Sequence, residues 1–420
     1  MTRQPKSMVP KVRFKGFTDE WEQRKFGEIY DKIRNAFVGT ATPYYVNQGH
    51  FYLESNNVKY GKLNFNNEVY INDDFYQKQK PNWLHTGDLV VVQSGHVGHS
   101  AVIPSELNNT AAHAVIIVAK PKQKIDSYFI NDYLQTNIAR KQIDNIATGN
   151  TIKHILASAM KMFEVSLPSY EEQRPISNLL AQIDDTITLQ QHKLDQLNTL
   201  KKGLLQKMFA DKKHPQPELR FKGFSGDWEQ RKLGEIMNVG SVKRIHQSDW
   251  KNEGVRFLRA RDIVALSKNE EPADPLYIDD SKYYEYSKVS GKVQKGDLLV
   301  TGVGSIGVPM LIESNEPIYF KDGNIIWFKN SNSLDGNFFY YSFTSSNIQN
   351  FIRKSSGTGT VGTYTIDNGK KTPILIPREK DEQQKIGLFF QQFDSLITLH
   401  QHKLDKLKKM KAAYLNEMFV

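Results

Sequence analysis

The chain carries three sequence blocks twice, and this internal repeat constrains its architecture more than any other feature. Residues 13–29, RFKGFTDEWEQRKFGEI, match residues 220–236, RFKGFSGDWEQRKLGEI, at all but four positions. Residues 86–102, TGDLVVVQSGHVGHSAV, align with residues 295–311, KGDLLVTGVGSIGVPML, and residues 171–209 align with residues 381–419. The chain has 420 residues, more than one hydrophobic core usually serves. The sequence therefore predicts two similar domains, each followed by the same closing segment.

Each closing segment has the apolar spacing of a coiled coil. Apolar side chains recur at alternating intervals of four and three residues, which predicts a helix with a seam that packs against a second helix. Two seam positions in each copy are polar, Gln190 and Lys201 against His400 and Lys411, and such residues tend to fix the register. The apolar seam positions are Ile176, Leu180, Ile183, Ile187, Leu194, Leu197, Leu204 and Met208, with Ile386, Phe390, Phe393, Ile397, Leu404, Leu407, Tyr414 and Met418 in the second copy.

The linker between the two copies predicts how these helices pair. A helix of roughly 38 residues is about 57 Å long, too long to be absorbed into a small globule. The linker ADKKHPQPEL is too short for the long return connection that a parallel pair would need. We therefore expect an α+β protein in which two tandem-repeated α/β domains are separated by two long antiparallel coiled-coil helices, with pseudo-two-fold symmetry. The expected segments are a domain at 1–168, a helix at 169–210, a linker at 211–219, a domain at 220–377 and a helix at 378–420.

One stretch matches the sequence motif of a dinucleotide-binding turn. Gly302, Gly304 and Gly307 follow an apolar run in the order G-x-G-x-x-G, but that motif holds a pyrophosphate only if a helix follows it. Here Pro309 lies in a short apolar run, and in the first copy Gln93 stands at the position of Gly302. The repeated glycines therefore favour a strand, a turn and a return strand, and exclude a cofactor site common to both halves.

Composition favours a soluble chain with a polyanionic partner. Lys and Arg outnumber Asp and Glu by 56 to 46, which gives a formal net charge of +10. There is no cysteine, so disulfides, thiolate metal sites and cysteine nucleophiles are excluded. No segment resembles a signal peptide or a membrane span, and we expect a cytoplasmic protein.

The sequence lacks recognisable catalytic motifs. It contains no phosphate-binding G-x-x-x-x-G-K-[ST] and no N/D-P-P-[YF] tetrapeptide. Its adjacent carboxylates, such as Asp73-Asp74, project in divergent directions. The pair His96 and His99 has a metal-like spacing, but Ser305 and Val308 replace it in the second copy, which favours a pair that faces solvent or the polyanionic partner over a zinc site.

The combination and order of the repeated blocks resemble the specificity (S) subunit of type I restriction-modification enzymes. The resemblance covers nearly the whole chain and rests on RFKGF…WEQRKFGEI, on GDLVVVQSGHVG, on LPSYEEQRPISNLL and on their second copies. It implies two target recognition domains that each read half of a split double-stranded DNA site, with the paired helices setting the gap. It also implies that two modification (methyltransferase) subunits and further restriction subunits dock on this chain. S-adenosylmethionine, ATP and Mg would then be bound by those partner subunits, with no cofactor, no metal and no catalytic residue in this chain.

Candidate DNA contacts are polar, basic and aromatic residues in the segments that differ between the copies. Arg reads guanine and Asn or Gln reads adenine by paired hydrogen bonds, while Lys, Ser and Thr commonly hold phosphates. The candidates in the first half are Asn56, Asn57, Lys59, Lys78, Lys80, His96, His99, Asn150, Thr151 and Lys153, and those in the second half are Arg244, Arg259, Arg261, Ser305, Lys354, Thr358, Thr360 and Tyr364.

The repeated blocks are candidates for docking, because two like subunits need two like surfaces. We expect Trp21, Arg24, Trp228, Arg231, His192 and His402 to serve there, with plain packing as the alternative for the two tryptophans. Two other functions stay open on the sequence alone. A self-sufficient nuclease or methyltransferase would need a motif that is missing, and a coiled-coil interaction scaffold would leave the divergent basic domains unexplained.

Overall fold

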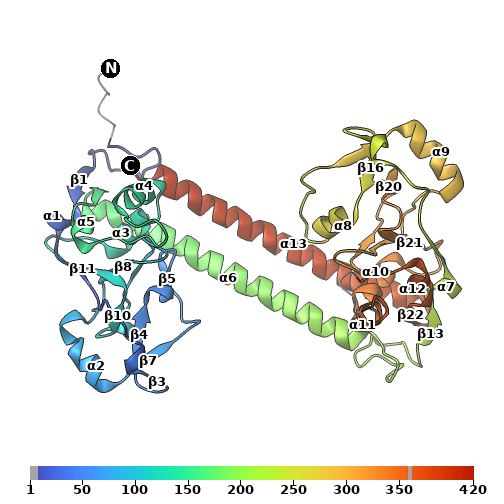
Figure 1. Ribbon diagram of the computed structural model, residues 1–420, viewed down its shortest axis with the longest axis horizontal. Helices are drawn as coiled ribbons and strands as arrows, with labels where there is room; N and C mark the ends of the chain where they lie inside the picture. Colours follow the sequence, from blue (N-terminus) through green and yellow to red (C-terminus); the bar gives the residue numbers. More distant parts are fainter. Residues whose placement is uncertain (1–7, 358–361) are drawn as a thin grey trace. The chain divides into compact units, whose positions relative to one another are not determined.

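The computed structural model describes residues 8–357 and 362–420, and this part of the chain forms two compact units. Unit 1 consists of the residues up to Gln191 together with His402–Val420, and unit 2 consists of His192–Gln401. In the chain, a long helix, α6 (Tyr170–Met208), lies between the two domains (Figure 1). Each unit therefore combines one domain with one end of each long helix.

Unit 1 is built on two four-stranded sheets that share part of their core, since one cluster of buried residues contains Leu53 of β4 and Val90 of β8. One sheet has the order β2-β11-β8-β9 and is antiparallel, and the other has the order β10-β4-β7-β3, with β10 parallel to β4. The two central strands of the first sheet contain continuous runs of buried apolar residues, LVVV in β8 and VIIVA in β11, because both of their faces are covered. The bounds are β2 (Tyr30–Asn35), β11 (Val115–Pro121), β8 (Leu89–Val92), β9 (Ser100–Val102), β10 (Ala111–His113), β4 (His50–Glu54), β7 (Val69–Ile71) and β3 (Tyr45–Val46).

Two small ribbons and short helices complete unit 1. Strand β1 (Glu22–Lys25) pairs antiparallel with β12 (Glu164–Leu167), and β5 (Val58–Lys59) forms a hairpin with β6 (Lys62–Leu63). The side chains of Asn72, Asp126 and Thr136 cap α2, α3 and α4 at their first turns, as sequence preferences at helix starts predict. The helices are α1 (Phe26–Ile29), α2 (Asp73–Lys78), α3 (Ser127–Leu134), α4 (Asn137–Ile146) and α5 (Ala157–Lys161), with 3-10 turns at Thr42–Tyr44, Ser55–Asn57, Lys80–Asn82 and Ser105–Leu107.

Unit 2 repeats the same topology. Its sheets have the orders β14-β21-β18-β19 and β15-β17-β16-β20, and β13 pairs with β22. The strands are β13 (Glu229–Lys232), β14 (Asn238–Gly240), β15 (Trp250–Lys251), β16 (Val255–Leu258), β17 (Leu276–Ile278), β18 (Leu298–Thr301), β19 (Pro309–Leu311), β20 (Ile318–Phe320), β21 (Ile325–Lys329) and β22 (Pro373–Ile376). The helices are α7 (Leu233–Ile236), α8 (Ala260–Leu266), α9 (Asp280–Ser290), α10 (Gly336–Thr344), α11 (Ser346–Ser355) and α12 (Ile366–Lys371), with a 3-10 turn at Gln247–Asp249.

The units differ locally where the sequences diverge. After β4, unit 1 continues into the hairpin β5–β6, whereas after β16 unit 2 continues into helix α8. The segment ARDIVAL of α8 has helical apolar spacing, with Ile263 fully buried, and its N-terminus is capped by Asp262, which accepts a hydrogen bond from the Arg259 backbone at 2.8 Å. One scaffold thus presents two different surfaces at equivalent places.

The glycine-rich stretch is a hairpin, as predicted. Strand β18 pairs antiparallel with β19, and β8 pairs with β9 in the same way. Gly304 and Gly307 have φ values of +69° and +81°, and Gly95 and Gly98 both have +84°, so the turn needs glycine at these positions in both copies. No helix follows the turn, and a dinucleotide-binding geometry is excluded there.

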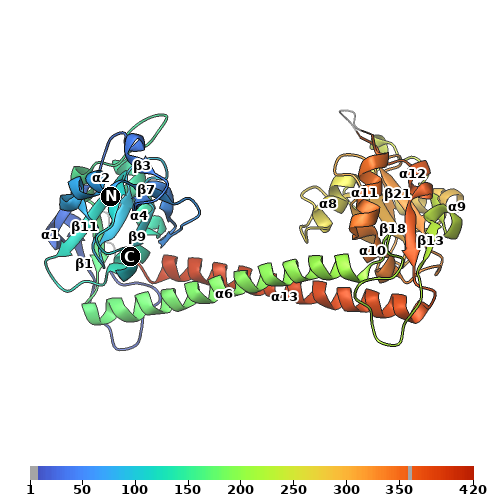
Figure 2. The ribbon, with the colours of Figure 1, turned by 90° about the horizontal axis from the view of Figure 1, so that it is seen from below.

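The two long helices pack antiparallel in both units (Figure 2). In unit 1 the first part of α6 packs on the last part of α13 (Lys380–Glu417), and in unit 2 the last part of α6 packs on the first part of α13. Lys411 donates to Asp184 at 2.7 Å in unit 1, and Lys201 forms the equivalent ion pair with Asp394 in unit 2. These polar seam residues therefore pair across the helices. The described helices include none with an apolar stretch sufficient to cross a lipid bilayer.

The repeated RFKGF…W block anchors the helix ends. In unit 1 Arg13 forms two hydrogen bonds with Glu172, at 2.6 and 2.8 Å, and in unit 2 Arg220 binds Glu382 at 2.7 and 2.8 Å. The four side chains are largely buried, so each pair holds the first turn of a long helix against its domain. The carboxylate of Glu172 is thus engaged by Arg13.

Each repeated tryptophan packs against a phenylalanine from the other half of the sequence. Trp21 lies edge-on to Phe419 at 6.1 Å between ring centroids, and Trp228 lies edge-on to Phe209 at 6.0 Å. Trp21 and Trp228 are each only 3% exposed. The expectation that these tryptophans form docking surfaces is therefore corrected: they are core residues that hold the helix ends.

Candidate nucleic-acid interface

Some of the candidate DNA-contacting residues lie on two loops of each unit that are hydrogen-bonded to each other. In unit 1 the turn between β8 and β9 meets the loop between α4 and α5, because the backbone N–H of Ile155 donates to Gln93 at 2.9 Å and Ser94 bridges His154. In unit 2 the turn between β18 and β19 meets the segment before α12, because the N–H of Tyr364 donates to Gly302 at 2.9 Å. Sequence reasoning selected the residues of both loops but did not place the loops together.

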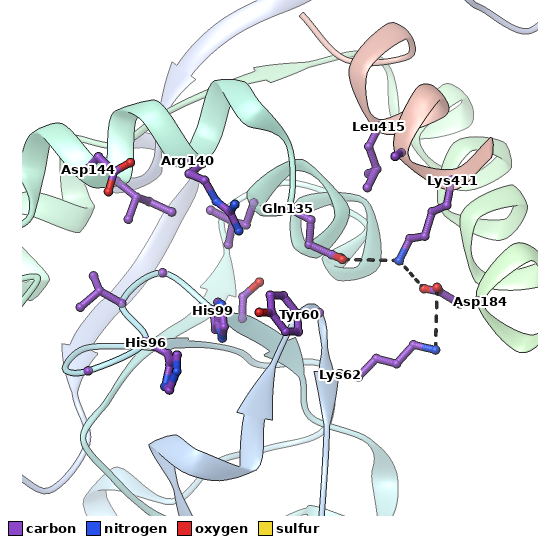
Figure 3. Close-up of a pocket in the computed structure, with 18 of the residues that line it drawn as sticks. Tyr60, Lys62, His96, His99, Gln135, Arg140, Asp144, Asp184, Lys411 and Leu415 are labelled. Carbon is purple, nitrogen blue, oxygen red and sulfur yellow. Dashed lines mark hydrogen bonds and ion pairs between the residues drawn. The ribbon is translucent and has the colours of Figure 1, made fainter. Parts of the chain in front are cut away.

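In unit 1 this arrangement brings together two histidines and a lysine. The rings of His96 and His99 lie 5.5 Å apart, and both residues line the same pocket as Lys153, whose Nζ lies 3.3 Å from Asp144 (Figure 3). Burial lowers the pKa of His99, and His96, Arg140 and Lys59 lower it further by charge repulsion. His99 is therefore neutral at pH 7, and its ring can donate one hydrogen bond and accept another.

The histidine pair lacks the further ligands that a metal requires. Within residues 8–357 and 362–420, no three His, Asp or Glu side chains gather closely enough to hold an ion. Tyr60 stacks obliquely on His99 at 4.5 Å, so an aromatic ring lies beside the pair. The arrangement is suited to hydrogen bonding and stacking.

Most of the other candidates in unit 1 are exposed. Lys59 lies 5.5 Å from the centre of the Tyr60 ring and Lys80 lies 5.8 Å from that of Trp83, so both ammonium groups stand over aromatic faces. Asn57 is the exception: it is 1% exposed, and its side-chain amide binds the backbone of residues 54, 64 and 67. Its expected role in DNA contact is corrected to support of the β5–β6 hairpin. Exposed candidates here are Asn56, Lys59, Lys78, Lys80, His96, Asn150, Thr151 and Lys153.

In unit 2 the structure separates exposed cations from structural ones. Arg244 and Arg261 have side chains 68% and 63% exposed. Arg259 has a side chain only 16% exposed, and its Nε and Nη2 each donate to Asp262 at 2.9 Å, so it serves the start of α8. Ser305 and Lys354 are exposed on the turn and at the end of α11.

Tyr364 is also a structural residue. It is 1% exposed and its hydroxyl is hydrogen-bonded to Thr372 at 2.5 Å, so the expectation that it contacts DNA is corrected. Thr358 and Thr360 lie outside the described residues. The remaining candidates stay predictions.

The docking candidates other than the tryptophans lie on accessible surface. Arg24 and Arg231 have side chains 35% and 40% exposed and pair with Glu28 and Glu235 four residues on. His192 and His402 are exposed on α6 and α13. These four residues are available to a partner, and their role stays a prediction.

Two residues of this region were missed by sequence reasoning, Tyr60 and Arg140. Tyr60 is 60% exposed at the turn between β5 and β6, and Arg140 lies on α4, where its side chain points toward His99 and Tyr60 (Figure 3). A signal for Tyr60 was present in the sequence KYGK, an aromatic residue between two lysines beside a turn glycine. Arg140 carried no such signal, because only the fold brings α4 beside the hairpin.

The fold defines a protein with two similar domains, and comparison with known proteins gives its family. The family model described as "Type I restriction modification DNA specificity domain" matches residues 18–199 and again residues 225–409. The chain belongs to this family, and it carries two such domains in tandem.

Curated relatives and solved structures agree with this assignment. The chain is 26% identical over 64% of its length to the type I restriction enzyme MjaVIII specificity subunit of Methanocaldococcus jannaschii, and the match spans 64% of that relative. It is 22% identical to the MjaIX specificity subunit of the same organism, over 79% of this chain and 76% of the relative. The fold is similar to the crystal structure of an S subunit of a type I restriction-modification system from M. genitalium, with a TM-score of 0.64 and 16% identity over 98% of this chain and 99% of that one. These similarities agree with membership of the family of type I restriction modification DNA specificity domains.

Proposed function

We propose that this subunit reads a two-part DNA site, one half-site per domain, and catalyses no reaction itself. The observation that carries the proposal is the repeated topology with different polar residues at equivalent loops. His96 and His99 of the first glycine turn correspond to Ser305 and Val308 of the second, and the hairpin β5–β6 corresponds to helix α8. Two equal scaffolds with different polar surfaces are suited to two different base sequences.

Recognition of the DNA site would combine contacts to phosphates with contacts to base edges. The exposed lysines and arginines of both domains supply the sequence-independent attraction, which a net charge of +10 favours. Arg261 and Arg244 are the candidates for paired hydrogen bonds to guanine in unit 2, and Asn56 or Asn150 for those to adenine in unit 1. The two histidines of unit 1 add donors and acceptors on a rigid turn.

The repeated surfaces would recruit the partner subunits. Arg24 with Arg231 and His192 with His402 occupy equivalent positions in the two copies, as two identical modification subunits require. We infer that these subunits bind S-adenosylmethionine and methylate adenine, and that restriction subunits bind ATP and Mg and cleave the DNA. The assembly would act in the cytoplasm.

The test is co-expression of the chain with its modification subunit, followed by mapping of methylated adenine in genomic DNA. The expected result is a motif of two parts with a fixed gap, of which only one part changes when residues 30–165 are replaced by those of a relative with a different site. The matched exchange in unit 2, over the residues between 237 and 372, should change only the other part. A complex that forms and leaves no split motif would favour an interaction scaffold and refute the proposal.

A further inference from the structure

A pocket of about 750 Å³ lies in unit 1 between the recognition loops and the long helices (Figure 3). Its walls come from the β5–β6 turn, the glycine turn after β8, helix α4 and the paired segments of α6 and α13. A volume of this size fits a small organic ligand. The pocket therefore joins the loops that differ between the two domains to the helices that they share.

The pocket has an apolar floor and a basic lining. Leu134, Ile143, Ile187 and Leu415 contribute apolar surface, and five lysine or arginine side chains face only two carboxylates, Asp144 and Asp184. Both carboxylates are already engaged, Asp144 by Lys153 and Asp184 by Lys411 and Lys62. The lining therefore carries an excess of positive charge over a hydrophobic base.

Arg140 supplies a positive charge that is not used by the protein itself. In the part of the chain that the structure describes, no carboxylate lies within 4 Å of its guanidinium. The side chain is exposed and points into the space beside His99 and Tyr60 (Figure 3). A planar guanidinium in this position matches the geometry of a phosphate group.

Tyr60 forms an aromatic platform at the edge of the pocket. Its backbone has φ of +49°, a conformation that is unfavourable for a side chain of this size, and yet the side chain is 60% exposed. The next residue, Gly61, has φ of +80°, a backbone conformation that favours glycine. Strained backbone that presents an exposed aromatic ring is a feature of binding sites.

A buried polar atom beside this platform lacks a partner. Nδ1 of His99 is inaccessible to solvent, and within residues 8–357 and 362–420 it forms no hydrogen bond. The Tyr60 ring lies 4.5 Å from the His99 ring. Platform, imidazole and guanidinium thus gather at one end of the pocket.

Unit 2 lacks this set of groups at the equivalent positions. Ser305, Val308 and Gln349 stand where unit 1 has His96, His99 and Arg140. The amide of Gln349 donates to the backbone of Gly307 at 3.0 Å and of Phe343 at 2.8 Å, so it is committed to the scaffold. The basic and aromatic lining of unit 1 is therefore not required by the fold.

We propose that this pocket binds a single nucleotide, with the base stacked on Tyr60 and His99 and the phosphate held by Arg140. The flat aromatic face of a base suits the platform and the apolar floor, and a phosphate suits the excess positive charge. Two sources present this chemistry: a nucleotide of the bound DNA that leaves its stack, or a free mononucleotide. The first of these rests on the proposed function.

The experiment measures nucleotide binding to the full-length chain in two arms. In the first arm, deoxyadenosine monophosphate is titrated and binding is followed by saturation-transfer NMR. In the second arm, a duplex that carries the mapped recognition site has 2-aminopurine in place of single adenines, and its fluorescence reports unstacking. The variants are Tyr60→Ala, Tyr60→Phe and Arg140→Ala, with Lys141→Ala as the control because Lys141 is an exposed cation on the same helix and does not line the pocket.

The expected result is at least tenfold weaker binding, or loss of the fluorescence change, for Tyr60→Ala and Arg140→Ala. Tyr60→Phe keeps the ring and should retain the signal, and Lys141→Ala should be unchanged. A response in the first arm identifies a free nucleotide, and a response in the second arm alone identifies a nucleotide of the DNA.

The inference is overturned if neither arm responds to the unmodified chain, or if Lys141→Ala weakens binding as much as Arg140→Ala. A folded state for each variant is verified by its circular dichroism and thermal midpoint. Unchanged nucleotide titration and an unchanged 2-aminopurine signal in Tyr60→Ala and Arg140→Ala would refute this inference and leave the proposed function intact. Absence of DNA binding by the unmodified chain would refute the proposed function. The first arm would then still test whether the pocket binds a nucleotide.

Discussion

Asp132 is a buried carboxylic acid on α3, close to the paired helices of unit 1, and is 6% exposed. Burial raises its pKa well above the usual range, Lys411 opposes this shift, and the charges of Asp184 and Asp126 add to it. Because the folded state holds the proton to a higher pH than the unfolded state does, the unfolded state releases protons first as pH rises. The stability that Asp132 contributes therefore falls as pH increases from its pKa in the unfolded state toward its pKa in the folded state.

We predict that Asp132→Asn raises the thermal midpoint of unit 1 at pH 7 to 8 and flattens the decline in stability above pH 4. An amide keeps the shape and the contact with Gln135, whose Nε2 lies 3.3 Å from the carboxylate, and has no proton to release. The measurement is differential scanning calorimetry between pH 4 and 8. The control is Asp185→Asn, at an exposed position on α6. Equal pH dependence in Asp132→Asn and the unmodified chain would contradict the argument.

At the scale of single residues, the sequence indicated which residue types the divergent loops contain. It did not indicate which of those side chains are exposed and which are buried. Most of the candidate residues are exposed, but Asn57 is buried and binds the backbone of Asn64, and Tyr364 is buried with its hydroxyl bonded to the side chain of Thr372. Sequence alone does not distinguish an amide that reads a base from one that stabilises a turn. Arg140 was missed for the opposite reason, since its neighbours come from distant parts of the chain.

Among the elements, the long helices carry reciprocal ion pairs in their seam. Lys411 and Asp184 have side chains 13% and 18% exposed, so removal of one partner leaves a charge in a poorly solvated place. We predict a coupling energy of about 1–3 kcal/mol in a double-mutant cycle with Lys411→Met and Asp184→Asn. Urea unfolding of the four proteins measures it.

The matched control for this cycle is Lys153 with Asp144, whose side chains are 56% and 59% exposed. An exposed pair of this kind contributes about 0–1 kcal/mol, because solvent screens it. A cycle at Lys411 and Asp184 that gives no more coupling than this control would show that the seam pair does not stabilise the helices.

The packing at the helix ends predicts that one substitution destabilises unit 1 and another destabilises unit 2. Phe419→Ala removes a ring that is 3% exposed beneath Trp21, and Phe209→Ala removes one that is 7% exposed beneath Trp228. Each substitution should cost about 3–5 kcal/mol in the unit that contains the ring. Hydrogen–deuterium exchange should therefore rise in β8 and β11 for Phe419→Ala and in β18 and β21 for Phe209→Ala. Equal effects of both variants on both units would contradict the packing described here.

The elements themselves were largely predictable from the sequence. Heptad spacing predicted the seam of α6 and α13, where Ile176, Leu180 and Phe390 are at most 1% exposed, and the repeated glycines predicted the hairpins. The order of the strands was not predictable, because β10 and β20 pair in parallel with strands far away in the chain. The role of the RFKGF block was also beyond sequence reasoning, since the partner of Arg13 is 159 residues away.

For the whole molecule, affinity for DNA should depend steeply on salt. Each lysine that neutralises a phosphate contributes about 0.9 to the slope of log K against log salt concentration. We predict that Lys59→Ala and Lys153→Ala each reduce that slope by about one and weaken binding to all sequences equally. Fluorescence anisotropy at several salt concentrations measures the slope, with Lys15→Ala, an exposed lysine away from the recognition loops, as the control. An unchanged slope would show that these lysines do not contact phosphates.

The last residues of α13 belong to unit 1, the unit that contains the N-terminal domain. This packing also sets the order in which the chain can fold during translation. Domains usually fold in the order of synthesis, the N-terminal one first. Unit 2 ends at Gln401, whereas unit 1 needs Met418 and Phe419 to complete its core. The recognition domain that the ribosome makes first is therefore the one that finishes last, and until then its core, including Trp21, stays open to chaperones and proteases.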